Sequence, residues 1–361
     1  MIAEDVGKTT ITTRSAECRS SIRLEPARCC LCNQDDSEPV AVGADFEYRT
    51  SPDEFLAVRC RRCRLVYLNP RVAECDIPVI YPDHYHAFQF RPAEFGLIYR
   101  IRCRLEAKRL LRWCQGLPFN AKILDVGCGD GFHLGLLKRY GYPGWTLEGV
   151  DVDGRAVARA RETGLTIHQG TIEQIDLPAG TQHLILMLMT VEHLSDPVGA
   201  LRAAERLLAP GGRIVVVTDN VRSPDSALFG GRHWGGYHFP RHTYLFDKRT
   251  LAEYGKAAGL EVERITTAVS PVNWVYSLRN WLDDWGGPRW LVNRFSLKSA
   301  FSLGVFTLLD MPLAAIGRGA ILQGIFCKPL QAKQQIDTRS FMKKLLDGPF
   351  RGPSNRFGGG S

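Results

Sequence analysis

Glycines at alternate positions follow a single carboxylate in the segment ILDVGCGDG, residues 123–131. The four residues are Asp125, Gly127, Gly129 and Gly131. Glycines at this spacing leave the backbone bare, so that a ligand can approach it closely. An apolar strand before them and an amphipathic run from Phe132 onward predict a strand, a tight turn and a helix N-terminus. A doubly wound α/β sheet receives an adenosine-containing cofactor on such a turn.

The charge of this turn indicates which cofactor it takes. A dinucleotide would place a pyrophosphate against the helix N-terminus, where Asp125 and Asp130 would repel it. The dinucleotide pattern also needs its third glycine where Phe132 stands. S-adenosylmethionine has no phosphate but carries an ammonium and a sulfonium group, which a carboxylate favours. The turn therefore predicts a methyl donor rather than NAD.

A second carboxylate, Asp151, ends the next predicted strand in TLEGVDVDG. It stands twenty residues beyond the last glycine of the turn, where a carboxylate can take the two ribose hydroxyls. A polar turn after the following strand would set Thr171 and Ile172 beside the adenine ring. A buried strand within 183–197 releases Met189 into the crevice at its end.

Two C-x-x-C pairs lie upstream of the turn. Their cysteines are Cys29, Cys32, Cys60 and Cys63. Two such pairs supply four thiolates in a tetrahedron, the closed arrangement of a structural Zn²⁺ site. A β-hairpin through Pro39–Val42 and Phe55–Val58 would bring the pairs together. Cys30 is adjacent to the first ligand and could exchange with it.

Disulfides are the alternative for these cysteines, and they need an oxidising compartment. The chain has 11 cysteines, an odd number, and it starts without a signal peptide, so we expect thiols and a cytoplasmic protein. A redox-active pair would need a thioredoxin-like setting, which does not follow in the sequence.

A loop rich in histidine and aromatic residues, GGRHWGGYHFPRHTYLF at 230–246, follows the fifth predicted core strand. Loops at the carboxyl ends of such strands face the ligand crevice. Methyl transfer is an in-line displacement that needs at most one base, to remove a proton from the acceptor. His242 is the first candidate for this base, followed by His193, Glu192 and His238. Each histidine could instead fix the loop through hydrogen bonds.

The order of motifs from about residue 119 to 268 resembles that of the class I S-adenosylmethionine-dependent methyltransferases. The pieces that carry the resemblance are ILDVGCGDG, GVD, TVEHLSDP and LLAPGGRIVVV. One departure is Thr171, where the family often has an aspartate. His242 stands in PRHTYLF, which is similar to a PRH segment near the reaction centre of the family. The resemblance implies an α/β fold with a Rossmann-like, seven-stranded sheet.

The expected parts of the chain follow from these motifs. In order they are a disordered N-terminus (1–24), a zinc ribbon (25–75), a connector with a basic helix (76–118), the methyltransferase domain (119–330) and a flexible C-terminal tail (331–361). An aromatic, helical insert at about 270–320 precedes the last strand, and Asp310 and Pro312 interrupt its apolar run, which argues against a transmembrane helix. The insert could be a lid over a hydrophobic substrate, a dimer interface or extra core.

The connector contains features of its own. Its tyrosines, within 68–88, are expected to lead toward the cofactor, or else to pack as an aromatic connector. Ile101 and Leu105 belong to the predicted apolar side of the basic helix. The basic side favours solvent, and it permits contact with an anionic substrate or an anionic membrane surface.

A ribbon before the cofactor domain resembles a bacterial arrangement whose members methylate small molecules, including sugar carbons. We therefore expect methyl transfer from S-adenosylmethionine to an oxygen or carbon of a sugar, a natural product or a hydrophobic metabolite. The net charge of +8 leaves an RNA methyltransferase as the alternative. However, the segment MLMTVEH lacks the Pro-rich polar motif that binds the exocyclic amines of bases, which argues against a nucleic-acid substrate. A non-catalytic cofactor-binding scaffold is a third interpretation, against which the turn and the histidine loop argue. The sequence does not indicate an oligomeric state.

Overall fold

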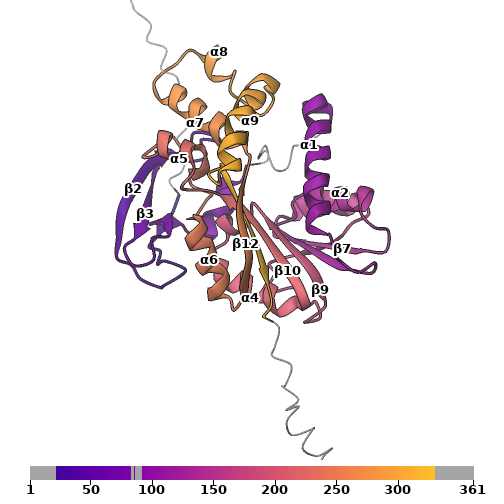
Figure 1. Cartoon of the computed structure of the whole chain (residues 1–361). Coiled ribbons are helices and arrows are strands. Elements are labelled where there is room, and N and C mark those ends of the chain that lie inside the picture. Colours follow the sequence, from indigo (N-terminus) through magenta and orange to yellow (C-terminus); the bar gives the residue numbers. More distant parts are fainter. Residues whose placement is uncertain (1–21, 83–84, 86–91, 330–361) are drawn as a thin grey trace, which may run out of the picture. The chain divides into compact units, whose positions relative to one another are not determined.

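A sheet of seven strands, in the order β12-β13-β10-β9-β6-β7-β8, lies at the centre of the computed structural model, which describes residues 22–82, 85 and 92–329 (Figure 1). The strands are β6 (Lys122–Val126), β7 (Thr146–Asp151), β8 (Thr166–Gln169), β9 (Gln182–Leu188), β10 (Leu208–Asp219), β12 (Glu261–Ala268) and β13 (Ile321–Cys327). Neighbours from β8 to β10 are parallel, whereas β13 is antiparallel to β10 and β12. This confirms the predicted Rossmann-like sheet. The strand order reverses between β6 and β9, so a ligand crevice is expected at their carboxyl ends.

Helices cover both faces of the sheet. They include α1 (Pro92–Trp113), α2 (Phe132–Tyr140), α3 (Gly154–Glu162), α4 (Pro197–Leu207) and α6 (Lys248–Ala257). Successive strand residues point to opposite faces: Leu124 and Ile185 pack in one apolar cluster with α4 and α6, and Ile123 and Leu186 pack in another with α1 and α2. The two layers therefore form a core on each side of the sheet.

Side-chain caps fix where three of these helices begin. Asp153 precedes α3 and accepts hydrogen bonds from two amides of its first turn. Asp196 caps α4, and Pro197 follows it in the first turn of the helix. Asp247 and Thr250 form a reciprocal capping box at the start of α6.

The buried side of α1 differs from the predicted one. Leu105 is 62 % exposed and Ile101 is also exposed, whereas Cys103, Ala107 and Leu110 are buried against the sheet. The buried residues follow the i, i+4, i+7 spacing of one helix face. This face of α1 packs on the sheet, so Ile101 and Leu105, on the other side of the helix, stay outside. The prediction for Ile101 and Leu105 was therefore wrong.

The cysteine-containing segment forms a small antiparallel sheet in the order β11-β4-β3-β2, together with a separate pair, β1 and β5. The strands are β1 (Leu24–Glu25), β2 (Ser37–Ala44), β3 (Glu54–Cys60), β4 (Val66–Leu68), β5 (Arg71–Val72) and β11 (Tyr244–Leu245). Val42 pairs with Leu56, as the expected hairpin requires. Because β11 belongs to the histidine loop, this small sheet, which we call the ribbon sheet, is completed by a strand from a distant part of the chain.

Leu24, the last residue of the predicted disordered N-terminus, lies in a strand and pairs with Val72. Residues 1–21 of the predicted disordered N-terminus and the predicted tail at 331–361 lie outside the described residues.

Three helices form the insert between β12 and β13. They are α7 (Pro271–Asp284), α8 (Arg289–Val292) and α9 (Ala300–Ala315), which gather together in Figure 1. The expectation of a helical insertion is thus confirmed. Within the described part of the chain, no helix is long and apolar enough to cross a membrane.

Candidate active site

The glycines after β6 all adopt a left-handed backbone. Their φ angles are +71° at Gly127, +54° at Gly129 and +79° at Gly131. A Cβ on Gly127 would lie 2.6 Å from Thr190 Cγ2, so packing excludes a side chain there. A Cβ on Gly129 would meet no described atom within 4 Å. Gly129 therefore faces open space at the carboxyl edge of the sheet.

Two carboxylates lie beside this turn. Asp151 accepts hydrogen bonds from the amides of Gly129 (2.8 Å) and Asp153 (2.9 Å), and burial raises its pKa. Asp125 is buried, and its Oδ2 has no hydrogen-bond partner among the described residues. Burial and the neighbouring Asp151 raise the pKa of Asp125 to about 8. A ligand with hydroxyl donors or a positive charge would stabilise both carboxylates.

The other expected cofactor contacts lie in different environments. Met189 follows β9, has a φ of +55° and is 39 % exposed, and such a strained backbone is typical of functional sites. Thr171 is partly buried, and its amide donates to Gln174 (3.2 Å). Ile172 is almost fully buried within the core.

The four residues proposed for catalysis lie together. The ring centroid of His242 is 4.6 Å from that of His193 and 4.9 Å from that of His238. A carboxylate oxygen of Glu192 and one nitrogen each of His193 and His242 lie within 4.8 Å of one another. The short helix η3 (Val191–His193) after β9 and the loop after β10 supply these side chains.

The ring of His242 is oriented by the Gly236 carbonyl and lies beside the Asp219 carboxylate. Its Nδ1 lies 2.8 Å from the Gly236 carbonyl oxygen and 3.3 Å from Asp219 Oδ2. A neutral ring that donates from Nδ1 keeps Nε2 as an acceptor. Burial by itself would lower the pKa of His242, but the Asp219 and Glu192 carboxylates outweigh it and raise the pKa. Asp219 also accepts a hydrogen bond from Asn273 of α7 (2.7 Å).

The other two histidines favour their neutral forms. His193 Nδ1 lies 3.0 Å from the Tyr81 hydroxyl and 3.2 Å from the Arg241 carbonyl oxygen. Burial, together with positive charge on His242, lowers the pKa of His193 far below its usual value. His238 Nδ1 lies 2.7 Å from Glu47 Oε2, yet burial lowers the pKa of His238 to about 4. Of the three rings, His242 is the one whose pKa is raised.

Glu192 is fully buried, and neither carboxylate oxygen has a hydrogen-bond partner among the described residues. Burial raises the pKa of Glu192 to about 7, although His242 opposes the shift. Its backbone carbonyl accepts the amide of Thr243 (2.7 Å), which ties η3 to the histidine loop. A buried carboxylate of this kind can hold a proton or accept a donor from a ligand.

A buried ion pair supports the histidine loop, and sequence reasoning missed it. The side chains of Arg241 and Asp45 are both 0 % exposed. Their two hydrogen bonds, Nη1 to Oδ1 and Nη2 to Oδ2, measure 3.1 and 2.9 Å. Arg241 Nε also donates to the carbonyl of Ile80 (2.7 Å). The PRH segment was a signal for Arg241, whereas nothing in the sequence pointed to Asp45.

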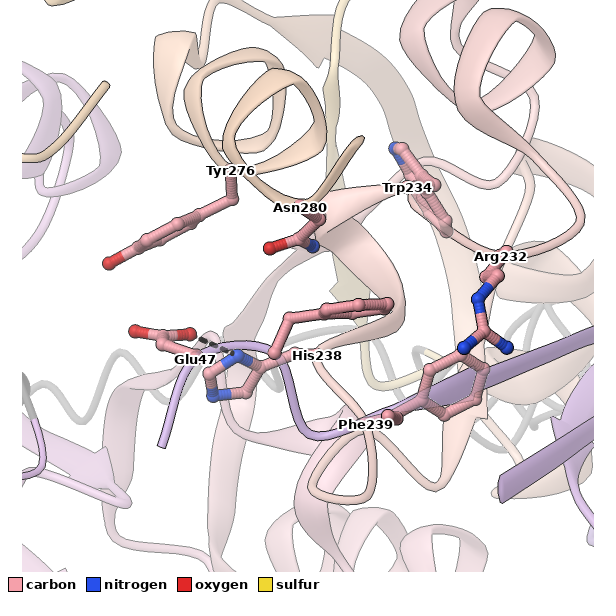
Figure 2. Close-up of a pocket in the computed structure, with 10 residues that line it drawn as sticks. Glu47, Arg232, Trp234, His238, Phe239, Tyr276 and Asn280 are labelled. Carbon is pink, nitrogen blue, oxygen red and sulfur yellow. Dashed lines mark ion pairs between the residues drawn. The ribbon is translucent and has the colours of Figure 1, made fainter. Parts of the chain in front are cut away.

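A small pocket opens beside His238 between the ribbon, the histidine loop and α7 (Figure 2). Its lining residues are Ala44, Phe46, Glu47, Arg232, Trp234, Gly235, His238, Phe239, Tyr276 and Asn280. Figure 2 shows the ion pair of Glu47 with His238, and Tyr276 and Asn280 extending from the α7 helix toward the same space. The insert therefore forms part of the pocket wall.

The four predicted metal ligands also converge. Cys29 Sγ lies 3.2 Å from Cys63 Sγ, and Cys32 Sγ lies 3.4 Å from Cys60 Sγ. All four sulfur atoms are within 4.8 Å of one another. Four thiols this close fit the tetrahedral set of a structural zinc ion, with no position open for a substrate.

The chain is similar to known methyltransferases. Residues 98–265 match a family model described as a methyltransferase domain. The ubiquinone biosynthesis O-methyltransferase of Pseudomonas aeruginosa is 33 % identical over 177 residues, which cover 45 % of this chain and 74 % of the relative. That of Cereibacter sphaeroides is 33 % identical over 176 residues, covering 45 % and 70 %.

A solved structure is also similar. It is a phosphoethanolamine N-methyltransferase of Haemonchus contortus in complex with S-adenosyl-L-methionine, with a TM-score of 0.48 and 14 % identity over 81 % of this chain and 68 % of that chain.

The chain belongs to the class I S-adenosylmethionine-dependent methyltransferases. It is an enzyme that transfers a methyl group from S-adenosylmethionine, within a fold that adds a cysteine cluster and a helical insert.

Proposed function

We propose that the methyl acceptor is a small molecule with a hydroxyl oxygen or an acidic carbon, and that His242 removes its proton. The observation that carries this proposal is the pairing of His242 with Asp219 inside the cluster at the carboxyl edge. The relatives from Pseudomonas and Cereibacter are O-methyltransferases of ubiquinone biosynthesis, which supports oxygen as the acceptor atom.

The cofactor would lie across the glycine turn. Asp151 would accept hydrogen bonds from the ribose hydroxyls. Gly129 has no side chain, so the cofactor could approach its backbone closely. The charge of Asp125 would favour the ammonium and sulfonium groups. Thr171, Ile172 and Met189 would border the adenine or the methionine moiety, with Met189 the most accessible of the three.

Proton removal would proceed through the His242 ring. With Nδ1 donating to the Gly236 carbonyl oxygen, Nε2 would take the proton from the methyl acceptor as the methyl group leaves the sulfonium. The imidazolium would then be stabilised by Asp219 and Glu192. His193 and His238, which favour their neutral forms, would orient the acceptor by hydrogen bonding.

A zinc ion would have a structural role. Cys29, Cys32, Cys60 and Cys63 would hold it, and it would stabilise the ribbon sheet that β11 completes.

The test is the variant His242→Ala. We expect turnover to fall by about 10²–10⁴, the usual contribution of a positioned base, while cofactor affinity stays unchanged. Turnover is measured as S-adenosylhomocysteine formed with a panel of phenols and hydroxylated sugars. His168→Ala is the matched control, because His168 lies in β8 and contacts Glu148 instead of the cluster.

The pH profile separates a base from a structural residue. His242 must be neutral to accept a proton, and the neighbouring carboxylates raise its pKa against the effect of burial. Wild-type turnover should therefore fall as the pH drops through that raised pKa. This limb should disappear in His242→Ala. Wild-type rates in the variant between pH 6 and 9 would make His242 structural and His193 the next candidate.

A further inference from the structure

Helix α9 exposes apolar side chains and buries polar ones, which is the opposite of a helix on a water-facing surface. Every exposed residue of the helix and its C-cap is apolar: Ala300, Phe301, Gly304, Val305, Leu308, Leu309, Met311, Pro312, Ala315 and Ile316. They recur at three- and four-residue intervals and so form one continuous stripe. Leu308 and Ile316 are 71 % and 69 % exposed. An apolar stripe of this extent indicates a partner that is not water.

Two polar residues of α9, Ser302 and Asp310, face inward and fix this orientation. Asp310 is fully buried, and its Oδ2 accepts the amides of Ser270 (2.9 Å) and Ala320 (3.2 Å). Ser302 is buried as well, and its hydroxyl donates to the Arg294 carbonyl (3.0 Å). Turning the apolar stripe inward would break these hydrogen bonds.

Positive charge lies at both ends of the stripe. Before the helix, the Arg294 guanidinium lies 5.0 Å from the centre of the Phe301 ring. After the helix, Arg318 is exposed, and the Lys248 ammonium lies close to Gly317.

The carboxylates of the insert do not offset this charge at its surface. Asp283 pairs with Arg49 and Arg289, Asp284 pairs with Arg232 and His233, and Asp310 is buried. An anionic surface is therefore the complementary partner.

We propose that α9 docks the enzyme on an anionic lipid bilayer, with its axis in the plane of the interface. The helix has 16 residues, about 24 Å at 1.5 Å per residue, and is too short to cross a hydrocarbon core of about 30 Å. Trp285 and Trp290, 73 % and 74 % exposed, are of the residue type that gathers at headgroup depth. Apolar burial and cation attraction together give such helices their membrane affinity.

Vesicle flotation tests the proposal without turnover, so it can fail or succeed independently of the proposed acceptor. The full chain should float with phosphatidylglycerol vesicles and bind phosphatidylcholine vesicles on the order of tenfold less, with binding weakened by salt. The double variant Leu308→Glu and Ile316→Glu should lose binding by tenfold or more. Both side chains are exposed, so the fold should persist, as circular dichroism would verify.

A matched control is Phe119→Glu, because Phe119 is 71 % exposed but lies outside the insert; it should bind like wild type. Wild-type protein that does not float, or a double variant that floats normally, would overturn the proposal. A dimer in light scattering that dissociates in the double variant would assign the stripe to a second copy of the chain instead.

Discussion

The Asp151 side chain contacts the glycine turn and is the proposed ligand of the ribose hydroxyls. It already accepts the Gly129 amide (2.8 Å), so it lies within reach of a ligand on that turn. Asp151→Ala should weaken S-adenosylmethionine binding by about 1.5–3 kcal/mol, the range for hydrogen bonds to a charged group. Calorimetry measures the affinity, with the exposed Asp176→Ala as control. Equal affinities would show that Asp151 does not bind the cofactor.

Glu192 predicts a pH-dependent stability. Its pKa rises from 4.5 to about 7 on burial, so the folded protein binds more protons and stability falls as the pH rises between these values. Glu192→Gln removes the ionisable group, and with it the free-energy cost of ionising a buried carboxyl at higher pH. The variant should gain stability relative to wild type between pH 5 and 8, by up to about 3 kcal/mol.

Urea unfolding of both proteins at the two pH values measures this difference. Glu162→Gln, at an exposed position of α3, should show no such gain. A pH-independent difference between Glu192→Gln and wild type would mean that Glu192 is ionised and paired in the folded state.

At the scale of elements, a fully buried ion pair joins the ribbon to the histidine loop. Asp45 follows β2, and Arg241 precedes His242. Asp45→Ala should lower the free energy of unfolding by about 3–5 kcal/mol, because it leaves the Arg241 charge buried and unpaired. Asp35→Ala is the control, since its partner Arg28 is also exposed, and it should cost less than about 1 kcal/mol. Similar losses in the two variants, measured by chemical denaturation, would refute this role of the pair.

At the scale of the whole molecule, the ribbon and the central sheet share structure. β11 completes the ribbon sheet, and Cys29 and Cys60 belong to the same apolar cluster as Phe246 and Leu251. Removal of zinc, or Cys60→Ser, should therefore lower the melting temperature of the entire protein by several degrees in one transition. Elemental analysis should find one zinc per chain.

The exposed Cys75→Ser is the control for this experiment and should melt like wild type. Protein without zinc, or a ribbon that melts separately while cofactor binding persists, would contradict the expectation.

Local sequence determined much of this protein. The alternate glycines predicted the turn, because a left-handed backbone conformation depends on the residue type at each position. Asp151 was predicted beside the turn because it ends the next strand of the sheet. Asp196 followed by Pro197 specified the start of α4 for the same local reason. The two C-x-x-C pairs specified a cysteine cluster, since their spacing sets the geometry of each half.

Only the tertiary structure decided which distant groups meet. Asp45 and Arg241 are far apart in the sequence, and their pairing arises because β11 joins the ribbon sheet. The raised pKa of His242 depends on Asp219, which β10 places beside it. The apolar stripe of α9 faces outward because Asp310, on the opposite side of the helix, accepts hydrogen bonds from the buried amides of Ser270 and Ala320. Burial and long-range contacts set these properties, and neither is encoded in local spacing.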